Sequence, residues 1–309
     1  MLYANEIDKT DTVSTLKNFE YHINRLNELG ILQVALLPKT LQVGEKVLEE
    51  GKHKFRPTEE EKFPNTAFLH NEYLRRLTDN YDLRQYTNQW AGCWDIYDDL
   101  VRESFMEFRK TSFYSDYIAL PSTDFAKDKE LSIILFRFLM NREALVAVIG
   151  ERSLLWEDDF EQIAQYNFMM LKSLDESTMN EAMTWPIMYD KRQEKDTADM
   201  DFARTLLRST LENRTFADEM IKSRLQGWEF ERVALMDILL INMAISELIS
   251  CPTIPEKVTI DEYIELSKEF SSERSRLFVN GILDKLVMEL RKQGKINKTG
   301  RGLAVMEEE

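Results

Sequence analysis

The sequence predicts an all-α protein built as a helical bundle. Apolar residues recur at three- and four-residue steps through most of the chain, which is the spacing of one helix face. No stretch alternates apolar and polar residues over four or more positions between turn signals, as strands do. The 10 glycines and 7 prolines in 309 residues are too few for a turn-rich β fold.

The expected helices of the first half are long and amphipathic. One spans residues 13–29 and ends near Gly30, and residues 31–50 continue the pattern with a kink or break at Pro38. A charged segment with two prolines, residues 51–65, predicts a loop.

Further helices follow towards the middle of the chain. Residues 68–77 and 83–109 are helical by their spacing, and the second range carries an aromatic-rich buried face. After a loop at 121–127, residues 131–148 form the most apolar helix, and residues 153–174 form the next. Residues 175–196 then form a mixed, charged connector.

The stretch from Pro255 to Leu290 predicts a helix, a polar loop at 271–275 and a second helix. Either Asp261, or Thr259 with Glu262 three residues later, can cap the first helix.

Gly281 lies inside the second of these helices. A glycine there costs about 1 kcal/mol relative to alanine, so another requirement selects it. Two explanations are open: close packing of a neighbouring helix, or close approach of a partner's backbone.

This region resembles the C-terminal signature of the NusB family of bacterial transcription antitermination factors. The resemblance rests on the sequence VTIDE at 258–262, ELSK at 265–268, and Ser275 followed by FVNGILDK at 278–285. The preceding helix is similar to the family as well, at Arg232, Ala234, Leu235, Met236, Ile238, Leu239 and residues 244–248. The match covers about Asp201 to Lys292, and the chain resembles the long form of Bacteroidetes NusB.

The N-terminus departs from the family pattern. Residues 2–6, LYANE, resemble the end of the first NusB helix, which an arginine-rich arm precedes in the family. Here the sequence begins at the leucine-tyrosine pair, so we expect either a truncated start or the loss of that arm. Because Lys and Arg contacts to phosphate supply most non-specific RNA affinity, the difference bears on RNA binding.

The resemblance divides the chain into three parts. Residues 1–195 would form an extended helical part, in which residues 8–195 replace the short first unit of the family. Residues 196–294 would form the NusB-like module, and residues 295–309 a basic and then acidic flexible tail.

Charge is distributed unevenly around the net value of -15. Residues 201–309 contain 16 Lys+Arg and 19 Asp+Glu, which leaves 24 Lys+Arg and 36 Asp+Glu in the first 200 residues. The excess of acidic residues argues against a nucleic-acid-binding surface in those first 200 residues. The sequence from Lys285 to Arg301 contains six basic residues and a single acidic residue, Glu289. That run could meet phosphate, but a solvated tail is the more ordinary explanation.

No motif for catalysis or for a bound cofactor is present. The sequence contains no GxGxxG, Walker, GxSxG or CxxC pattern, and the Glu50-His53 pair has no second copy with which to form a di-metal site. Its two cysteines, Cys93 and Cys251, are isolated and fit a reducing cytoplasm. No run reaches the roughly 18 apolar residues of a membrane span. We therefore expect a cytoplasmic protein that is not an enzyme, has no cofactor or metal, and has no membrane partner.

The resemblance implies an RNA-binding adaptor. It would bind boxA-type RNA together with NusE, a ribosomal protein, within the RNA polymerase antitermination complex. The RNA-binding residues would be Arg274, Ser275, Arg276, Phe278, Asn280, Gly281 and Lys285, where the two arginines are chosen by charge and not by motif. The partner-binding residues would be Glu229, Arg232, Glu247, Thr253 and Pro255.

Two other functions stay open. Leu277 stands where the family commonly has a basic residue, and this favours a protein–protein scaffold of the NusB fold that has lost RNA binding. An RNA-modifying enzyme with a NusB-like domain is the other alternative, but the first 200 residues show no cofactor loop.

Overall fold

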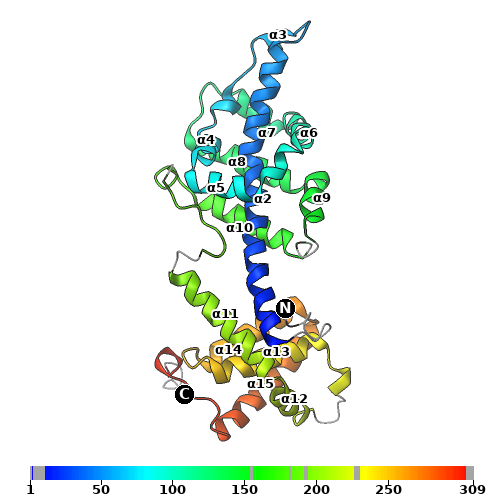
Figure 1. Cartoon of the computed structure of the whole chain (residues 1–309), viewed down its shortest axis with the longest axis vertical. Coiled ribbons are helices and arrows are strands. Elements are labelled where there is room, and N and C mark those ends of the chain that lie inside the picture. Colours follow the sequence, from blue (N-terminus) through cyan, green and yellow to red (C-terminus); the bar gives the residue numbers. More distant parts are fainter. Residues whose placement is uncertain are drawn as a thin grey trace. The chain divides into compact units, whose positions relative to one another are not determined.

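The computed structural model describes residues 2, 11–153, 156, 158–180, 182–190, 194–225 and 230–303. Every regular element in these ranges is a helix, which confirms the all-α class (Figure 1). Contacts divide the chain into two compact units. We call residues 23–190 the central unit, and residues 1–22 together with 191–309 the C-terminal unit. The domain boundary that the sequence predicts at residue 195 stays a prediction.

Helix α2 runs without interruption from Thr12 to Lys52, with Pro38 inside it. The expected helix end at Gly30 and the expected break at Pro38 are therefore wrong. Gly30 lies against α10, where the Asn167 side-chain amide donates a hydrogen bond to the Gly30 carbonyl oxygen at 3.0 Å. Residues around both positions are almost fully buried, and this burial offsets the local helix penalties.

The other helices of the central unit are shorter than the sequence suggests. They are α3 (Glu59–Lys62), η1 (Ala67–His70), α4 (Glu72–Asp79), α5 (Tyr81–Trp90), η2 (Gly92–Asp95), α6 (Asp98–Phe108), α7 (Ser112–Ile118), α8 (Phe125–Met140), α9 (Glu143–Glu151) and α10 (Phe160–Ser173). The single helix expected at 131–148 is two helices that meet at Asn141 and Arg142. The helix expected at 83–109 is interrupted in the same way by η2.

Side-chain caps explain several of these short helices. Asn71, Asn80 and Asp124 each accept a hydrogen bond from the backbone amide three residues later, at 2.8–2.9 Å. Such caps satisfy amides that lack a partner at a helix start, so the chain can begin a new helix after a short turn.

Large aromatic side chains fill the core of the central unit. Trp94, Trp156 and Trp185 are each 1% exposed. The indole nitrogen of Trp94 donates to the Leu32 carbonyl oxygen at 3.0 Å, which satisfies a polar group that would otherwise be costly to bury. The Phe68 and Phe105 rings pack with centroids 5.0 Å apart.

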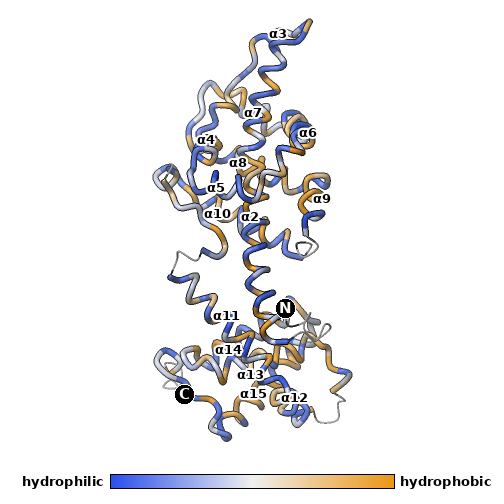
Figure 2. The backbone as a smooth tube through the Cα atoms, in the orientation of Figure 1, coloured by the Kyte–Doolittle hydropathy of each residue, from blue (hydrophilic) through white to orange (hydrophobic). Residues whose placement is uncertain are grey.

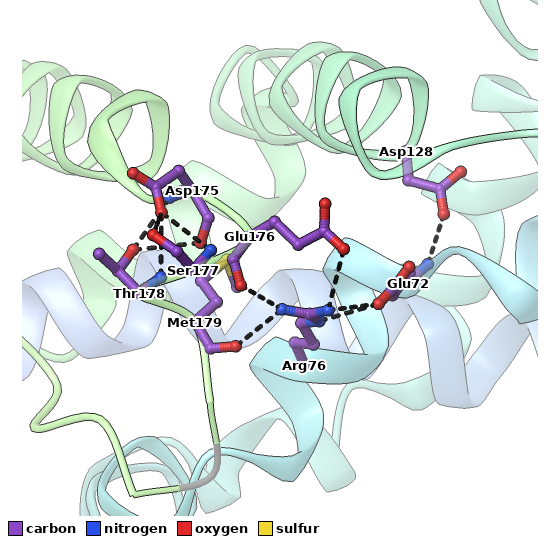
Figure 3. A network of polar contacts seen from close by, with 8 residues as sticks. All are labelled: Glu72, Arg76, Asp128, Asp175, Glu176, Ser177, Thr178 and Met179. Atoms are coloured by element: carbon purple, nitrogen blue, oxygen red, sulfur yellow. Dashed lines mark hydrogen bonds and ion pairs between the residues drawn. The ribbon is translucent and has the colours of Figure 1, made fainter.

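The connector after α10 is held to α4 by polar contacts (Figure 3). The Arg76 guanidinium donates to the carbonyl oxygens of Glu176 and Met179 and pairs with the Glu72 carboxylate. Asp175 accepts from the Ser177 and Thr178 amides at 3.0 and 2.9 Å, which forms a tight turn. Residues 175–179 of the connector therefore have a defined path although the sequence is mixed.

The C-terminal unit is built around one apolar helix. Its helices after residue 190 are α11 (Glu194–Glu212), α12 (Arg214–Lys222), η4 (Phe230–Arg232), α13 (Leu235–Ser250), α14 (Glu256–Phe270), α15 (Glu273–Lys292) and η5 (Gly300–Leu303). Helix α13 packs against α11, α12, α14 and α15. Eleven of its sixteen residues are buried, so it forms the centre of this unit's core.

The surrounding helices are amphipathic, as their alternation of hydrophobic and hydrophilic residues shows (Figure 2). The first turns of α2 belong to this unit, and Glu20 there accepts a hydrogen bond from Arg204 of α11 at 2.8 Å. Thr15 is 2% exposed.

Part of the segment 295–303, where the sequence predicts the start of a flexible tail, packs on the C-terminal unit. Ile296 packs on the core of the C-terminal unit and Lys298 is 8% exposed. The backbone amide of Thr299 donates to the Pro252 carbonyl oxygen at 2.9 Å. The last part of that predicted tail, residues 304–309, lies outside the described residues. Among the helices described, none is both long and apolar enough to cross a membrane.

Candidate nucleic-acid and partner interface

A buried carboxylate joins the C-terminal end of α13 to the start of α14. Glu247 is 6% exposed and accepts hydrogen bonds from the Thr259 hydroxyl at 2.8 Å and the Tyr263 hydroxyl at 3.1 Å. Burial, and then the nearby Glu247 charge, raise the pKa of Tyr263. Thr259 lies within α14, which begins at Glu256 with Pro255 as its N-cap, so the caps expected at Thr259 or Asp261 are wrong.

A second polar cluster joins the other end of α13 to the turn between α14 and α15. Asp237 of α13 is 5% exposed and accepts a hydrogen bond from the Ser271 hydroxyl. The Ser275 hydroxyl lies 2.9 Å from the hydroxyls of both Ser271 and Ser272. These bonds satisfy a carboxylate that would be costly to bury alone.

The two clusters fix the α14–α15 hairpin at both of its ends. Near its open end, the Arg291 guanidinium forms an ion pair with Glu256 at 2.9 Å. Glu256 is 7% exposed, so the pair is partly shielded from water. The outer face of α15 is therefore held in a defined position on a rigid core.

Helix α15 buries one face and exposes the other. Its buried residues are Val279, Ile282, Leu283, Leu286, Val287 and Leu290. We call the opposite side the α15 outer face, which consists of Arg276, Leu277, Asn280, Gly281, Asp284, Lys285 and Met288. Leu277 and Met288 are 71% and 55% exposed, so the face mixes apolar, basic and amide side chains.

Gly281 has no packing role within its unit. Apart from its chain neighbours and the adjacent backbone of its own helix, a Cβ atom built on this residue would meet no atom of the described chain within 4 Å. Close packing of a neighbouring helix, one of the two explanations open from the sequence, is therefore wrong for the described residues. Approach of a partner's backbone is the explanation that stays open.

The residues predicted to bind RNA fall into three groups. Arg276, Gly281 and Lys285 are exposed on α15, and Phe278 and Asn280 beside them are half-buried. Ser275 is 5% exposed, and its bonds within the serine cluster give it an internal role. Its role as an RNA-contact residue stays a prediction. Arg274 belongs to α15, but its side chain lies outside the described residues.

The residues predicted to bind a protein partner do not form one surface. Thr253 is exposed and Pro255 half-buried in the α13–α14 turn, and Arg232 is exposed at the end of η4. Glu247 is buried and accepts hydrogen bonds from Thr259 and Tyr263, and its role as a partner contact stays a prediction. Glu229 lies outside the described residues.

Several cations of the basic run after Lys285 have contacts within the molecule. Arg291 pairs with Glu256, and the Lys295 ammonium lies 4.5 Å from the centroid of the Phe216 ring. Lys298 is buried and donates to the Cys251 carbonyl oxygen at 3.0 Å. The run is therefore neither a free phosphate-binding patch nor a solvated tail throughout.

Sequence reasoning missed the Asp237–Ser271 contact and the packing of residues 294–303. A signal for the second was available, because three of the chain's ten glycines lie between residues 294 and 302. Two of them, Gly294 and Gly300, have positive φ values of 65° and 55°, a conformation that favours glycine.

Comparison with known proteins agrees with the signature residues of α14 and α15. A NusB family model matches residues 160–288. The transcription antitermination protein NusB of Salinibacter ruber is 43% identical over 114 residues, which cover 37% of this chain and 71% of that protein. NusB of Chloroherpeton thalassium is 38% identical over 103 residues, 33% of this chain and 49% of that protein.

One solved structure is also similar in sequence. It is NusB of T. maritima, 34% identical, with a match that covers 42% of this chain and 76% of that chain at a TM-score of 0.29. The assignment rests on the sequence matches, above all on the Salinibacter ruber protein, of which more than two thirds is covered. The chain belongs to the NusB family.

Proposed function

We propose that this chain is a non-catalytic RNA-binding adaptor in transcription antitermination. In this proposal it pairs with the ribosomal protein NusE in the cytoplasm, and the two proteins together hold a boxA-type single-stranded RNA on RNA polymerase. The observation that carries the proposal is the α15 outer face, where family signature residues surround a glycine that nothing in its own unit requires.

The chemistry of this face suits single-stranded RNA. Unpaired bases are typically held by stacking and by hydrogen bonds to their edges, with Arg or Lys on the phosphates. Arg276 and Lys285 supply exposed cations, and Asn280 supplies an amide that can both donate and accept. The absence of a side chain at Gly281 lets a ribose-phosphate backbone approach the helix closely.

A separate surface would bind the protein partner. The α13–α14 turn exposes Pro252 and Thr253, and its backbone is held by hydrogen bonds from residues 298 and 299. Arg232 adds an exposed cation near the start of α13. In this proposal, one protein contacts the turn while RNA lies along α15.

A protein–protein scaffold without RNA binding is the second candidate. The exposure of Leu277 and Met288 favours it, because large apolar side chains on one helix face are typical of protein interfaces. The central unit contains 29 Asp+Glu and 19 Lys+Arg, so its net charge is negative. This negative charge would also repel an RNA that extended over the unit.

Fluorescence anisotropy with a labelled boxA-type RNA distinguishes the two candidates. The chain is titrated into the RNA with and without saturating NusE, and a scrambled RNA of equal length serves as the control. Preference for the boxA-type RNA in the presence of NusE supports the adaptor. NusE binding without any RNA binding supports the scaffold, and failure to bind either molecule rejects both.

A further inference from the structure

The segment after α15 folds back onto the α13–α14 turn. We call residues 294–303 the C-terminal strap, and residues 251–255 the turn. The strap begins with a backbone motif that ends α15 and reverses the chain. The Lys295 amide donates to the Leu290 carbonyl oxygen at 3.0 Å, while Gly294 adopts a left-handed conformation. This is a Schellman motif, which redirects the chain in a fixed way.

The strap contacts the backbone of the turn at close range. The Thr299 amide donates to the Pro252 carbonyl oxygen at 2.9 Å. Gly302 lies against the same carbonyl group, and a Cβ atom built on it would be 2.3 Å from that oxygen. Real Cβ atoms essentially never come so close to a backbone atom, so only glycine fits at this position.

A buried lysine forms the centre of the contact. Lys298 is 8% exposed, and its ammonium donates to the Cys251 carbonyl oxygen, which also accepts from the Ile254 amide at 3.2 Å. The ammonium therefore lies at the C-terminal end of α13, where the helix dipole favours a cation. Glu247 and Glu256 are its charged neighbours and favour its charged form.

The strap binds the carbonyl groups of the turn and leaves its outer residues accessible. Pro252 and Thr253 both stay exposed with the strap in place. A segment that occupied the partner site would cover these residues. The contacts instead restrict the backbone conformation of the turn, which lowers the conformational entropy that a partner must remove on binding.

We propose that the C-terminal strap pre-organises the α13–α14 turn for its protein partner, with Lys298 and Gly302 as positioning residues. This inference rests on the proposed function, in which the turn contacts NusE. Neither residue touches the partner. Both act through the carbonyl groups of Cys251 and Pro252.

The test is NusE binding by the full chain and four variants, measured by calorimetry. Gly302→Ala places a methyl group against the Pro252 carbonyl, and Lys298→Met keeps the apolar stem but removes the ammonium. Lys298→Arg keeps a cation and its donors. Lys292→Met is the matched control, because Lys292 is exposed on the last turn of α15. Helix content and RNA affinity without NusE are measured for each variant.

We expect Gly302→Ala and Lys298→Met to weaken NusE binding about tenfold. Lys298→Arg should recover at least half of the lost binding free energy, that is, half of the change in log Kd. Lys292→Met should have a Kd for NusE within twofold of that of the unchanged chain. RNA affinity without NusE should change less than twofold, because the α15 outer face is not altered. This selective loss, recovered by arginine, distinguishes positioning from general destabilisation.

Two outcomes overturn the inference. If the unchanged chain binds NusE and both strap variants bind it equally well or more tightly, the strap does not position the turn, and the proposed function is unaffected. If the unchanged chain fails to bind NusE, the partner assignment of the proposed function is wrong, and the inference falls with it.

Discussion

The Thr259 hydroxyl donates a 2.8 Å hydrogen bond to the carboxylate of Glu247, and both side chains are buried. This bond connects the first turns of α14 to the apolar helix at the centre of the unit. A buried carboxylate needs such donors, because an unsatisfied charge inside a protein costs several kcal/mol.

Replacement of Thr259 by valine should lower the free energy of unfolding by about 1.5–3 kcal/mol. The two side chains have similar shapes, so the loss comes from a hydrogen bond to a charged group. Urea unfolding followed by circular dichroism measures it. Thr253→Val, at an exposed position in the turn, should change stability by less than about 0.5 kcal/mol. Equal effects at the two positions would contradict the role given to Glu247.

Gly281→Ala should separate stability from RNA binding. Alanine should stabilise α15 by about 0.5–1 kcal/mol, because it favours the helix and the new methyl group has no neighbour within 4 Å beyond the adjacent backbone of α15. The same methyl group should weaken boxA-type RNA binding about tenfold if the RNA backbone approaches Gly281. Thermal unfolding and anisotropy measure the two effects.

Gly150→Ala is the matched control for that experiment. Gly150 also lies in a helix with nothing near its Cβ position, but in the central unit. Its replacement should leave RNA affinity unchanged. A Gly281→Ala chain that gained stability and kept full RNA affinity would remove Gly281 from the proposed interface.

Arg276→Ala and Lys285→Ala should each reduce the salt dependence of RNA binding. A cation that contacts one phosphate of a single strand contributes about -0.7 to the slope of log K against log salt. Each variant should therefore show a shallower slope by about that amount. Lys257→Ala is the control, since Lys257 is exposed at the other end of the hairpin and should leave the slope unaltered. An unchanged slope in both variants would exclude phosphate contacts there.

The stability contributed by Lys298 should depend on pH. Burial lowers the pKa of Lys298 below the ordinary lysine value of 10.5, although Glu256 and Glu247 oppose the shift. The Lys298 ammonium thus loses its proton at a lower pH in the folded chain than in the unfolded chain. Between those two pKa values the unfolded state holds more protons, so stability rises with pH.

Urea unfolding at pH 8, 9 and 10 tests this direction. The free energy of unfolding of the unchanged chain, less that of Lys298→Met, should increase over this range. Glu247, Cys251 and Glu256 act on the ammonium, and Tyr263 and Arg291 contact the two glutamates. All five groups are present in both proteins, so their titration largely cancels. For Lys292→Met the corresponding difference should stay flat. A difference for Lys298→Met that falls with pH would contradict the account.

Local sequence patterns predicted the helical class and the α14–α15 hairpin well. The buried positions of α15 recur at three- and four-residue steps. The break before α15 falls at Ser271 and Ser272, inside the loop expected at 271–275, whereas residues 273–275 already belong to α15. The signature residues around Asn280 also led to the correct family. Such features depend on neighbours within a few residues, which the sequence displays directly.

The errors concern positions that distant contacts decide. Gly30 was expected to end a helix, but its contact with Asn167, 137 residues away, supports an uninterrupted α2. The burial of Glu247 was not predicted, because its two hydrogen-bond donors come from another helix. The contacts of Lys298 and Gly302 with the turn were not predicted, because they involve residues about 50 positions earlier. No local pattern specifies such contacts.

The thermodynamic coupling between RNA and NusE tests the central claim most directly. Calorimetry measures the affinity of the chain for boxA-type RNA with and without NusE, and for NusE with and without the RNA. The adaptor account predicts that each ligand strengthens the other by the same factor, about tenfold or more, as linkage requires. NusE binding that leaves RNA affinity undetectable, or two ligands that bind with no effect on each other, would contradict it.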